Sequence, residues 1–176
     1  MTDLIPAWQS GSLTPVDKLV VHQLGLRHMA VSVFVLQGAS VLIQRRAMGK
    51  YHTPGLWANT CCTHPLRGEP AEVCAVRRLR EELGITGLTP RYRDQVEYRA
   101  DVGGGLTEHE VVEIFVAEAS PGLQVVPNPV EVMEVRWVSL QNLAAEARLD
   151  PQRFTPWLRI YLADHSDSIF GSLISA

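Results

Sequence analysis

One helix in the middle of the chain restricts the possible folds most strongly. It is predicted to start at Glu69-Pro70 and to stop at Gly84, with proline at the start and glycine just past the end. On a helical wheel an apolar arc of about 100° is separated from a charged arc. The apolar arc holds Ala75, Val76, Leu79 and Leu83, and the charged arc holds Arg77, Arg78, Glu81 and Glu82. The apolar arc should dock on a sheet, while the charged arc should face a cleft or solvent.

Apolar, β-branched runs predict the strands of such a sheet over residues 29–36, 41–45, 92–100, 107–119 and 132–138. Capping residues predict further helices from Thr14 to about Gly25, over 140–147 behind Ser139, and a final helix from Thr155-Pro156 to about Ala163. Strands and helices are mixed without a regular βαβ alternation. We therefore expect an α+β fold, an α/β/α sandwich around a mixed sheet.

The length of 176 residues suits one hydrophobic core. We expect a single domain over residues 14–176 behind a leader or edge segment at residues 1–13. The net charge of -3 disfavours a general nucleic-acid or membrane-surface binder, because such proteins need a basic face. We see neither a signal-peptide pattern nor an apolar run long enough to cross a bilayer. Three cysteines cannot all pair, so we expect reduced thiols and a cytoplasmic protein.

Two carboxylates lie on one face of a predicted strand. Glu108 and Glu110 are two residues apart, and side chains at that spacing point to the same side of a strand. Burying both is costly unless a cation lies between them. With three histidines they form a candidate nitrogen and oxygen site for Mn²⁺, Zn²⁺ or Mg²⁺, the histidines being His22, His28 and His64. The alternative is an edge strand on which both glutamates are solvated.

Four basic residues come from four different predicted elements of this acidic chain. They are Lys18, Arg46, Lys50 and Arg78. If they converge, they form an anion pocket suited to phosphate. The alternative for the charged helix is two surface ion pairs, Arg77 with Glu81 and Arg78 with Glu82, worth about 0.3–0.5 kcal/mol each. Candidate aromatic walls of a pocket are Trp57, Tyr98 and Trp157, for which core packing is the alternative.

The segment from Trp57 to Gly84 contains all three cysteines. Cys62 precedes Thr63-His64, whereas its neighbour Cys61 would point the other way in an extended segment. Cys62 is therefore a candidate soft nucleophile or base. The alternative is a small buried hydrophobic residue, which suits Cys74 best. The pattern lacks the second ligand pair of a zinc finger.

Five motifs in order resemble the type I isopentenyl-diphosphate isomerases, a metal-dependent family built on a Nudix-like fold. They are Trp57-Ala-Asn-Thr-Cys-Cys-Thr-His-Pro, Gly68-Glu69 with Arg77-Arg78-Leu79-Arg80-Glu81-Glu82-Leu83-Gly84, Tyr98-Arg99-Ala100, Glu108-His109-Glu110 and Pro156-Trp157. The resemblance extends from about Lys18 to Trp157. It implies a single Nudix-like domain that interconverts isopentenyl diphosphate and dimethylallyl diphosphate through a tertiary carbocation, for isoprenoid precursor biosynthesis.

The resemblance also implies roles for individual residues. Cys62 would be one catalytic acid/base, and Glu110, helped by Tyr98, would be the other. Glu82 and substrate oxygens would hold Mg²⁺, and Trp157 would cover the hydrocarbon end. The first divalent metal would be held by His22, His28, His64, Glu108 and Glu110, and the diphosphate by Lys18, Arg46, Lys50 and Arg78. No flavin is implied. The expected partner is a small prenyl diphosphate, and the expected state is a monomer or weak homodimer.

Two other functions stay open. The first is a Nudix hydrolase of a nucleoside diphosphate derivative. The Nudix pattern asks for Arg-Glu, a hydrophobic residue and then x-Glu-Glu, and here Arg78 replaces the first glutamate. A cation in place of a metal-binding carboxylate disfavours a multi-metal clamp for hydrolysis. The second is a non-catalytic, metal-stabilised diphosphate-binding module in which Cys62 is inert. No Gly-x-Gly-x-x-Gly motif follows a strand, which disfavours a flavin enzyme.

Overall fold

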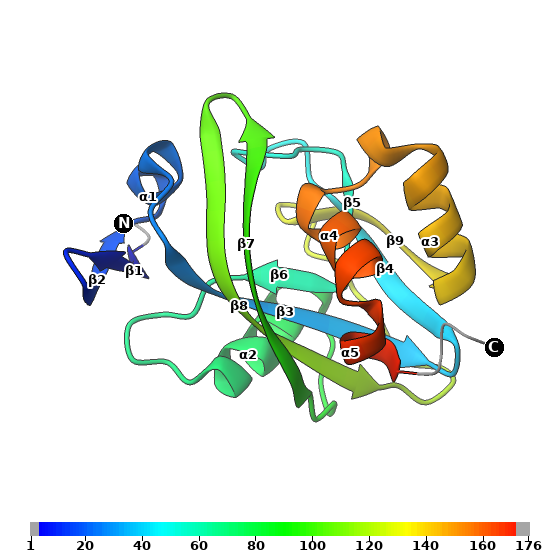
Figure 1. Cartoon of the computed structure of the whole chain (residues 1–176). Coiled ribbons are helices and arrows are strands. Elements are labelled where there is room, and N and C mark those ends of the chain that lie inside the picture. Colours follow the sequence, from blue (N-terminus) through cyan, green and yellow to red (C-terminus); the bar gives the residue numbers. More distant parts are fainter. Residues whose placement is uncertain (1–3, 172–176) are drawn as a thin grey trace.

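The computed structural model describes residues 4–171 (Figure 1). Their elements, in chain order, are β1 (Leu4–Gln9), β2 (Ser12–Asp17), α1 (Lys18–Leu24), β3 (His28–Gln37), β4 (Ser40–Arg46), β5 (Trp57–Ala58), β6 (Cys61–Thr63), α2 (Ala71–Leu83), β7 (Arg91–Gly103), β8 (Leu106–Glu118), β9 (Val132–Ser139), α3 (Leu140–Leu149), the 3₁₀ helix η1 (Pro151–Arg153), α4 (Pro156–Asp164) and α5 (Ser166–Phe170). The five strands predicted from the sequence are β3, β4, β7, β8 and β9.

Strand β3 is the centre of a mixed nine-stranded sheet. It pairs in parallel with β8, from His28 opposite Glu110 to Leu36 opposite Glu118. Its remaining pairings are antiparallel and are shared between β1, β6 and β4. Strand β7 pairs with the free side of β8, and β4 continues the sheet to β5 and β9. The predicted mixed sheet is confirmed, and β8 lies inside it.

Strands β3 and β4 pair only over the last three residues of β3 and then diverge. Two side chains connect the strands where the backbone pairing has ended. The Thr60 hydroxyl donates to Leu42 O at 2.5 Å and accepts from Val35 N at 2.9 Å. The Asn59 amide donates to Val33 O at 3.1 Å. Because buried backbone groups need partners, these side chains replace the missing backbone ladder. They also fix the position of the cysteine pair that follows.

Helices cover the sheet on both faces (Figure 1). Alternate residues of β3 pack on opposite sides, as the period of two in a strand requires. Val31, Val33 and Val35 belong to the core beneath α2. Phe34 and Leu36 belong to the core that contains residues of α3, α4 and α5. The expected α/β/α sandwich of the α+β class is therefore confirmed.

Helix α2 has the predicted ends, since Pro70 is its N-cap and Gly84 ends it in the left-handed conformation. The predicted apolar arc was wrong at one position, because Val76 is 47% exposed. Its place in the buried stripe is taken by Cys74, which is 0% exposed. Cys74 is thus a small buried core residue, which confirms the alternative reading given for this cysteine. The charged residue Glu82 is also buried in this stripe.

The predicted start of the first helix at Thr14 was wrong. Residues 12–17 form β2, which pairs with β1 as a hairpin. The helix α1 begins only after Asp17, whose carboxylate accepts a hydrogen bond from Val20 N at 3.0 Å. Pro15 is compatible with this outermost strand, because edge strands tolerate a missing N–H. Pairing with β1 is a contact between separate segments, and it overrides the local helix signal.

The final helix was also predicted too simply. Helix α4 starts behind Thr155 as expected, but it is followed by the short helix α5, which buries Ile169 and Phe170.

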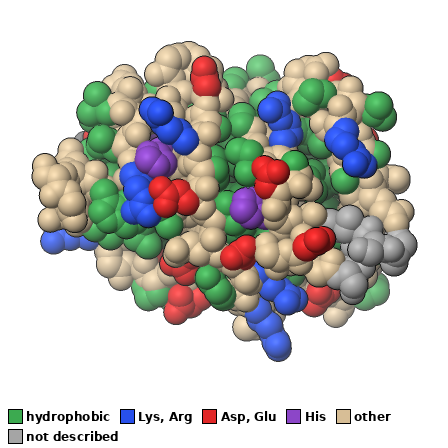
Figure 2. Space-filling model, viewed as in Figure 1, with side chains coloured by type: hydrophobic (Ala, Val, Ile, Leu, Met, Phe, Trp, Pro, Cys, Tyr) green, Lys and Arg blue, Asp and Glu red, His purple; other side chains and the backbone are tan. Residues whose placement is uncertain are grey.

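Basic and acidic side chains are interspersed on the face shown in Figure 2. Over residues 4–171, no helix has the length and apolar character needed to cross a membrane.

Gly84→Ala should destabilise the fold more than Gly122→Ala. Both glycines have positive φ, +64° and +88°, where alanine is strained by about 1–2 kcal/mol. Only at Gly84 would the new Cβ lie 3.0 Å from the backbone oxygen and Cβ of Val126, because open space surrounds Gly122. Urea unfolding monitored by circular dichroism should give a lower midpoint for Gly84→Ala, and equal midpoints would contradict this reading of the helix end.

Candidate active site

Four side chains with ligand atoms, three of them from buried residues, meet beside the start of β8. The ligand atoms of His22, His28, His64 and Glu108 all lie within 4.8 Å of one another. These residues belong to α1, the start of β3, the segment after β6, and β8. The fold thus brings together three histidines and a glutamate that the sequence analysis proposed as metal ligands.

Backbone carbonyls orient two of these imidazoles. His22 Nδ1 lies 2.6 Å from Lys18 O, and His28 Nδ1 lies 2.8 Å from Leu26 O. A carbonyl can only accept, so each Nδ1 carries a proton, and each Nε2 is the atom whose lone pair the neutral ring would offer to a metal. Both Nε2 atoms face Glu108 Oε2, at 3.2 Å and 3.4 Å. A carbonyl behind the ring is the usual support of a metal-binding histidine.

The unpartnered atoms of this cluster fit a divalent cation. His28 Nε2 and Glu108 Oε2 are buried, and neither has a hydrogen-bond partner in the described part of the chain. Buried polar atoms in proteins almost always have a partner. A cation between an imidazole nitrogen and a carboxylate oxygen would satisfy both, and this donor set suits Mn²⁺, Zn²⁺ or Mg²⁺.

Glu108 and Glu110 are each 2% exposed, and β8 is an inner strand that pairs with β3 on one side and with β7 on the other. The alternative of a solvated edge strand was therefore wrong. Burial raises the pKa of Glu108, but the neighbouring imidazoles of His22, His28 and His52 outweigh it and hold the pKa well below its usual range. Glu108 is therefore a carboxylate.

Glu110 differs from its neighbour in its protonation. Burial and then the nearby charge of Glu108 raise the pKa of Glu110 to about 7. The Tyr98 hydroxyl donates to Glu110 Oε2 at 2.5 Å, and His64 Nε2 lies 3.1 Å from Oε1. A carboxyl group with a pKa near neutrality can both give and take a proton at physiological pH.

The two adjacent cysteines point to opposite sides of β6, as predicted. Cys61 is fully buried in the core beneath α2. Cys62 lies opposite Ser32 of β3, whose hydroxyl donates to Cys62 Sγ at 3.4 Å. Burial, followed by the charge of Glu110, raises the pKa of the Cys62 thiol well above its usual value. At neutral pH Cys62 is therefore a protonated thiol.

An inner cavity unites most of the residues proposed from the sequence. Its lining includes Lys18, Arg46, Lys50, Cys62, His64, Arg78, Glu82, Glu108, Glu110 and Trp157. It shares walls with a larger cleft of about 620 Å³, through Lys18, Lys50, His64 and Arg78 among others. The other proposed residues stand behind this lining, since His22 and His28 face Glu108 and Tyr98 contacts Glu110. The four separate cations do converge.

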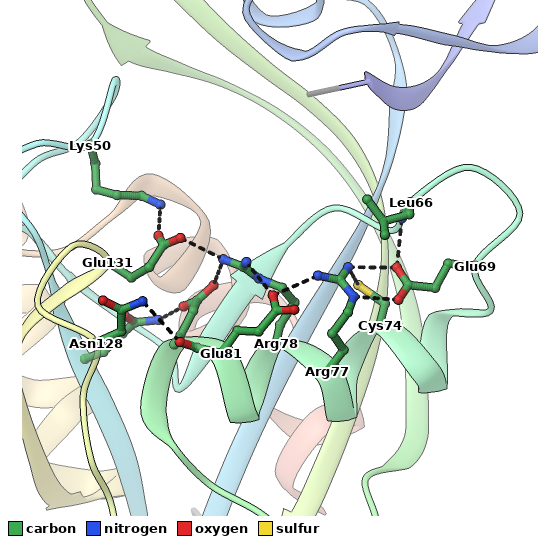
Figure 3. A network of polar contacts seen from close by, with 11 residues as sticks. Lys50, Leu66, Glu69, Cys74, Arg77, Arg78, Glu81, Asn128 and Glu131 are labelled. Atoms are coloured by element: carbon green, nitrogen blue, oxygen red, sulfur yellow. Dashed lines mark hydrogen bonds and ion pairs between the residues drawn. The ribbon is translucent and has the colours of Figure 1, made fainter. Parts of the chain in front are cut away.

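Both ion pairs predicted along α2 are present, and only the first of them is a surface pair. Arg77 contacts Glu81 at 2.9 Å and Arg78 contacts Glu82 at 2.6 Å. The Glu82 side chain is only 5% exposed, and its second oxygen accepts from Gln44 at 2.9 Å. Arg77 also pairs with Glu69 at 2.6 Å (Figure 3). Arg78 and Glu82, in contrast, both line the inner cavity.

The Trp57-Ala-Asn motif positions Trp157. Trp57 O accepts from Thr155 N at 2.9 Å, immediately before α4, and Asn59 Oδ1 accepts from the Trp157 indole at 3.1 Å. The Trp157 ring thereby faces the cavity, with the Arg46 guanidinium 5.2 Å from its centroid. Trp57 itself packs in the core and against Arg136, so core packing was the right alternative for this residue.

Two aromatic residues in the loop after β4 were missed by sequence reasoning. His52 Nε2 lies 2.9 Å from Glu108 Oε1, and the Tyr51 hydroxyl lies 3.1 Å from His22 Nε2. His52 Nδ1 lies 3.1 Å from the hydroxyl of Thr53, which has a φ of +46°. That conformation is rare for a β-branched residue and occurs at functional sites. A loop without periodicity gave no signal that could have placed these rings.

Comparison with known proteins agrees with this geometry. The NUDIX domain family matches residues 26–158. A protein of Cereibacter sphaeroides (strain ATCC 17029 / ATH 2.4.9) named isopentenyl-diphosphate Delta-isomerase is 69% identical over 173 residues, which cover 98% of each chain. A protein of Dinoroseobacter shibae with the same name is 65% identical over 176 residues, covering both chains fully. The resemblance inferred from the motifs is confirmed.

Solved structures share the fold at low identity. A MutT NUDIX hydrolase from Burkholderia pseudomallei has a TM-score of 0.62 at 24% identity, covering 79% of this chain and 98% of its own. A protein from Deinococcus radiodurans has a TM-score of 0.70 at 14% identity, covering 90% and 96%. These likenesses concern the fold alone. Together with the full-length relatives, they show that the chain belongs to the isopentenyl-diphosphate delta-isomerase family and has a Nudix fold.

Proposed function

We propose that this protein interconverts isopentenyl diphosphate and dimethylallyl diphosphate in isoprenoid precursor synthesis. One observation carries the proposal beyond the names of its relatives. The Cys62 thiol and the Glu110 carboxyl group line the same inner cavity as Trp157 and four cations. Two proton-transfer groups, an aromatic wall and an anion pocket are what this isomerisation requires.

The chemistry follows from the weakness of an alkene as a base. A proton is added to the terminal alkene carbon, which leaves a tertiary cation. A second proton is then lost from the carbon on the other side of the cationic centre, so the double bond moves by one position. One protein group gives a proton and the other takes one. Such general acid and base groups typically contribute about 10²–10⁴-fold each.

Cys62 and Glu110 are the proposed acid/base pair. A thiol that keeps its proton at neutral pH and a carboxyl group with a pKa of about 7 suit this exchange. The short hydrogen bond from Tyr98 supports Glu110 in its charged form. The face of Trp157 would stabilise the cation by about 2 kcal/mol in a site without water, and it would cover the hydrocarbon end.

We propose that His22, His28, His64, Glu108 and Glu110 would hold the first divalent metal, Mn²⁺, Zn²⁺ or Mg²⁺. When bound, this ion supplies positive charge beside the two buried carboxyl groups. Lys18, Arg46, Lys50 and Arg78 would bind the diphosphate. Glu82 would share Mg²⁺ with the diphosphate, because its oxygens accept one hydrogen bond each from Gln44 and Arg78 and a carboxylate has about four lone-pair sites.

The wider setting follows from the same features. We infer that the substrate is a small prenyl diphosphate and that the enzyme works in the cytoplasm as a monomer or weak homodimer, without nucleic acid or a membrane. Three free cysteines support a reducing compartment.

The hydrolase alternative is disfavoured because Arg78 pairs with three carboxylates near the place where a hydrolase would bind metal ions.

Proton NMR of isopentenyl diphosphate in D₂O tests the proposed function. The metal-stripped protein should be inactive, and Mg²⁺ and Mn²⁺ should be added back separately. Dimethylallyl diphosphate with incorporated deuterium is the expected product. Phosphate release from nucleotide substrates without isomerisation would favour the hydrolase, and metal-dependent binding without any turnover would favour the binding module.

Cys62→Ala should nearly abolish isomerisation, whereas Cys61→Ala should leave most of it. The two thiols are adjacent, but only Cys62 lines the inner cavity. Loss of a general acid or base should lower kcat by about 10²–10⁴-fold. The D₂O reaction measures both variants, and circular dichroism checks their folding. Equal activity of the two single variants would refute the assignment of Cys62.

His52→Ala should weaken divalent metal binding by about 10–100-fold, because it removes the side chain that contacts Glu108 Oε1. Isothermal titration of the metal-stripped protein with Mn²⁺ measures this effect. His109→Ala is the matched control, since His109 lies on β8 between the two glutamates but pairs outward with Glu97. An unchanged Mn²⁺ affinity in His52→Ala would show that His52 only fills space.

A further inference from the structure

The Arg78 guanidinium is surrounded by carboxylates (Figure 3). Its Nη1 donates to Glu81 at 2.9 Å, and its Nη2 donates to Glu82 at 2.6 Å and to Glu131 at 3.2 Å. Its Nε is buried and has no hydrogen-bond partner among residues 4–171. Both hydrogens of Nη2 are thus used, on Glu82 and Glu131. A ligand that binds through Nη2 must replace one of these two carboxylates.

Glu131 is the carboxylate that connects two of the cavity cations. Its Oε2 accepts from Lys50 at 2.5 Å, while its Oε1 accepts from Arg78. Each oxygen therefore binds one cation, which is how a phosphoryl ligand would bridge them. Glu82, in contrast, is buried and braced by Gln44, and Glu81 is shared with Arg77 on the outer side. Glu131 also lines the large cleft beside Lys50 and Arg78.

The backbone of Glu131 is fixed, so only its side chain needs to move for the contact to open. Its carbonyl accepts from Ala47 N at 2.9 Å, and its N–H donates to Asn128 O at 2.9 Å. Asn128 N in turn donates to Glu82 O at 2.8 Å. Burial raises the pKa of Glu131, but Lys50 and Arg78 lower it to about 2. Glu131 is therefore charged at neutral pH.

We propose that Glu131 is a built-in anion of the diphosphate subsite, and that a phosphoryl ligand binds by replacing its carboxylate on Lys50 and Arg78. The inference rests on the proposed function, since it assumes that these cations bind the diphosphate. A diphosphate carries more negative charge than one carboxylate and reaches both cations together, so it displaces Glu131. Glu131 keeps the two cations paired and weakens the binding of every phosphoryl ligand by the same factor.

The size of the effect depends on how often the side chain swings away. If the free enzyme exposes both cations about one tenth of the time, the apparent affinity for any phosphoryl anion is reduced about tenfold. Removing the negative charge without shortening the side chain removes this competition. The gain should be the same for inorganic phosphate and pyrophosphate, because both have to displace the same carboxylate.

Isothermal titration of the full-length protein with inorganic pyrophosphate and with inorganic phosphate tests the proposal. Glu131→Gln should tighten both by about tenfold. Glu134→Gln is the matched control for charge, because Glu134 is 52% exposed and pairs with Arg45 outside the cavity lining. It should leave both affinities unchanged. The KM for isopentenyl diphosphate should fall in Glu131→Gln as well.

Two outcomes would overturn the proposal. Weaker pyrophosphate binding in Glu131→Gln would mean that Glu131 orients Lys50 and Arg78 for the ligand, and unchanged binding would mean that it only neutralises them. Lys50→Ala tests the proposed anion pocket independently of the role of Glu131. If Lys50→Ala loses pyrophosphate affinity while Glu131→Gln is unchanged, only the role of Glu131 fails. If neither variant changes pyrophosphate binding, the proposed anion pocket is wrong as well as the role of Glu131.

Discussion

The burial of two carboxyl groups on a central strand is the constraint on which the rest of this site depends. Glu108 and Glu110 lie on β8 between β3 and β7, where each is 2% exposed. Taking a carboxylate out of water costs several kcal/mol unless nearby groups compensate. The parallel register places His28 opposite Glu110. The N-terminal hairpin and α1 then add His22, and β6 leads to His64.

The loop after β4 joins the histidine and glutamate cluster to the anion pocket. The His52 side chain contacts Glu108, while the carbonyls of His52 and Thr53 accept from Arg46 at 3.1 Å and 3.3 Å. A displacement of Arg46 would therefore move the residue that supports a proposed metal ligand. The left-handed conformation of Thr53 is strained, and the surrounding contacts hold it in place.

Local signals predicted those parts of the fold that depend on a few neighbouring residues. Pro70 and Gly84 mark the ends of α2 because capping acts within one turn. The helix expected from Thr14 failed because β1 pairs with residues 12–17, a contact that no capping rule contains. Val76 was placed on the wrong side because a helical wheel does not show where the sheet lies. The short strands β5 and β6 were missed because two or three residues show no periodicity, and their pairing with β4 and β3 joins separate segments.

By itself, the sequence determined which residues are candidates for the site, since the resemblance carried by its motifs implied an acid/base pair, ligand histidines and four cations. It also determined that Glu108 and Glu110 share a face, because strand alternation is local. Only the tertiary structure decided that this face is buried, that His52 supports Glu108, and that Glu131 occupies Lys50 and Arg78. The reason is distance along the chain. Glu131 and Lys50 are 81 positions apart and His64 and Glu110 are 46, whereas propensity and periodicity act over one or two turns.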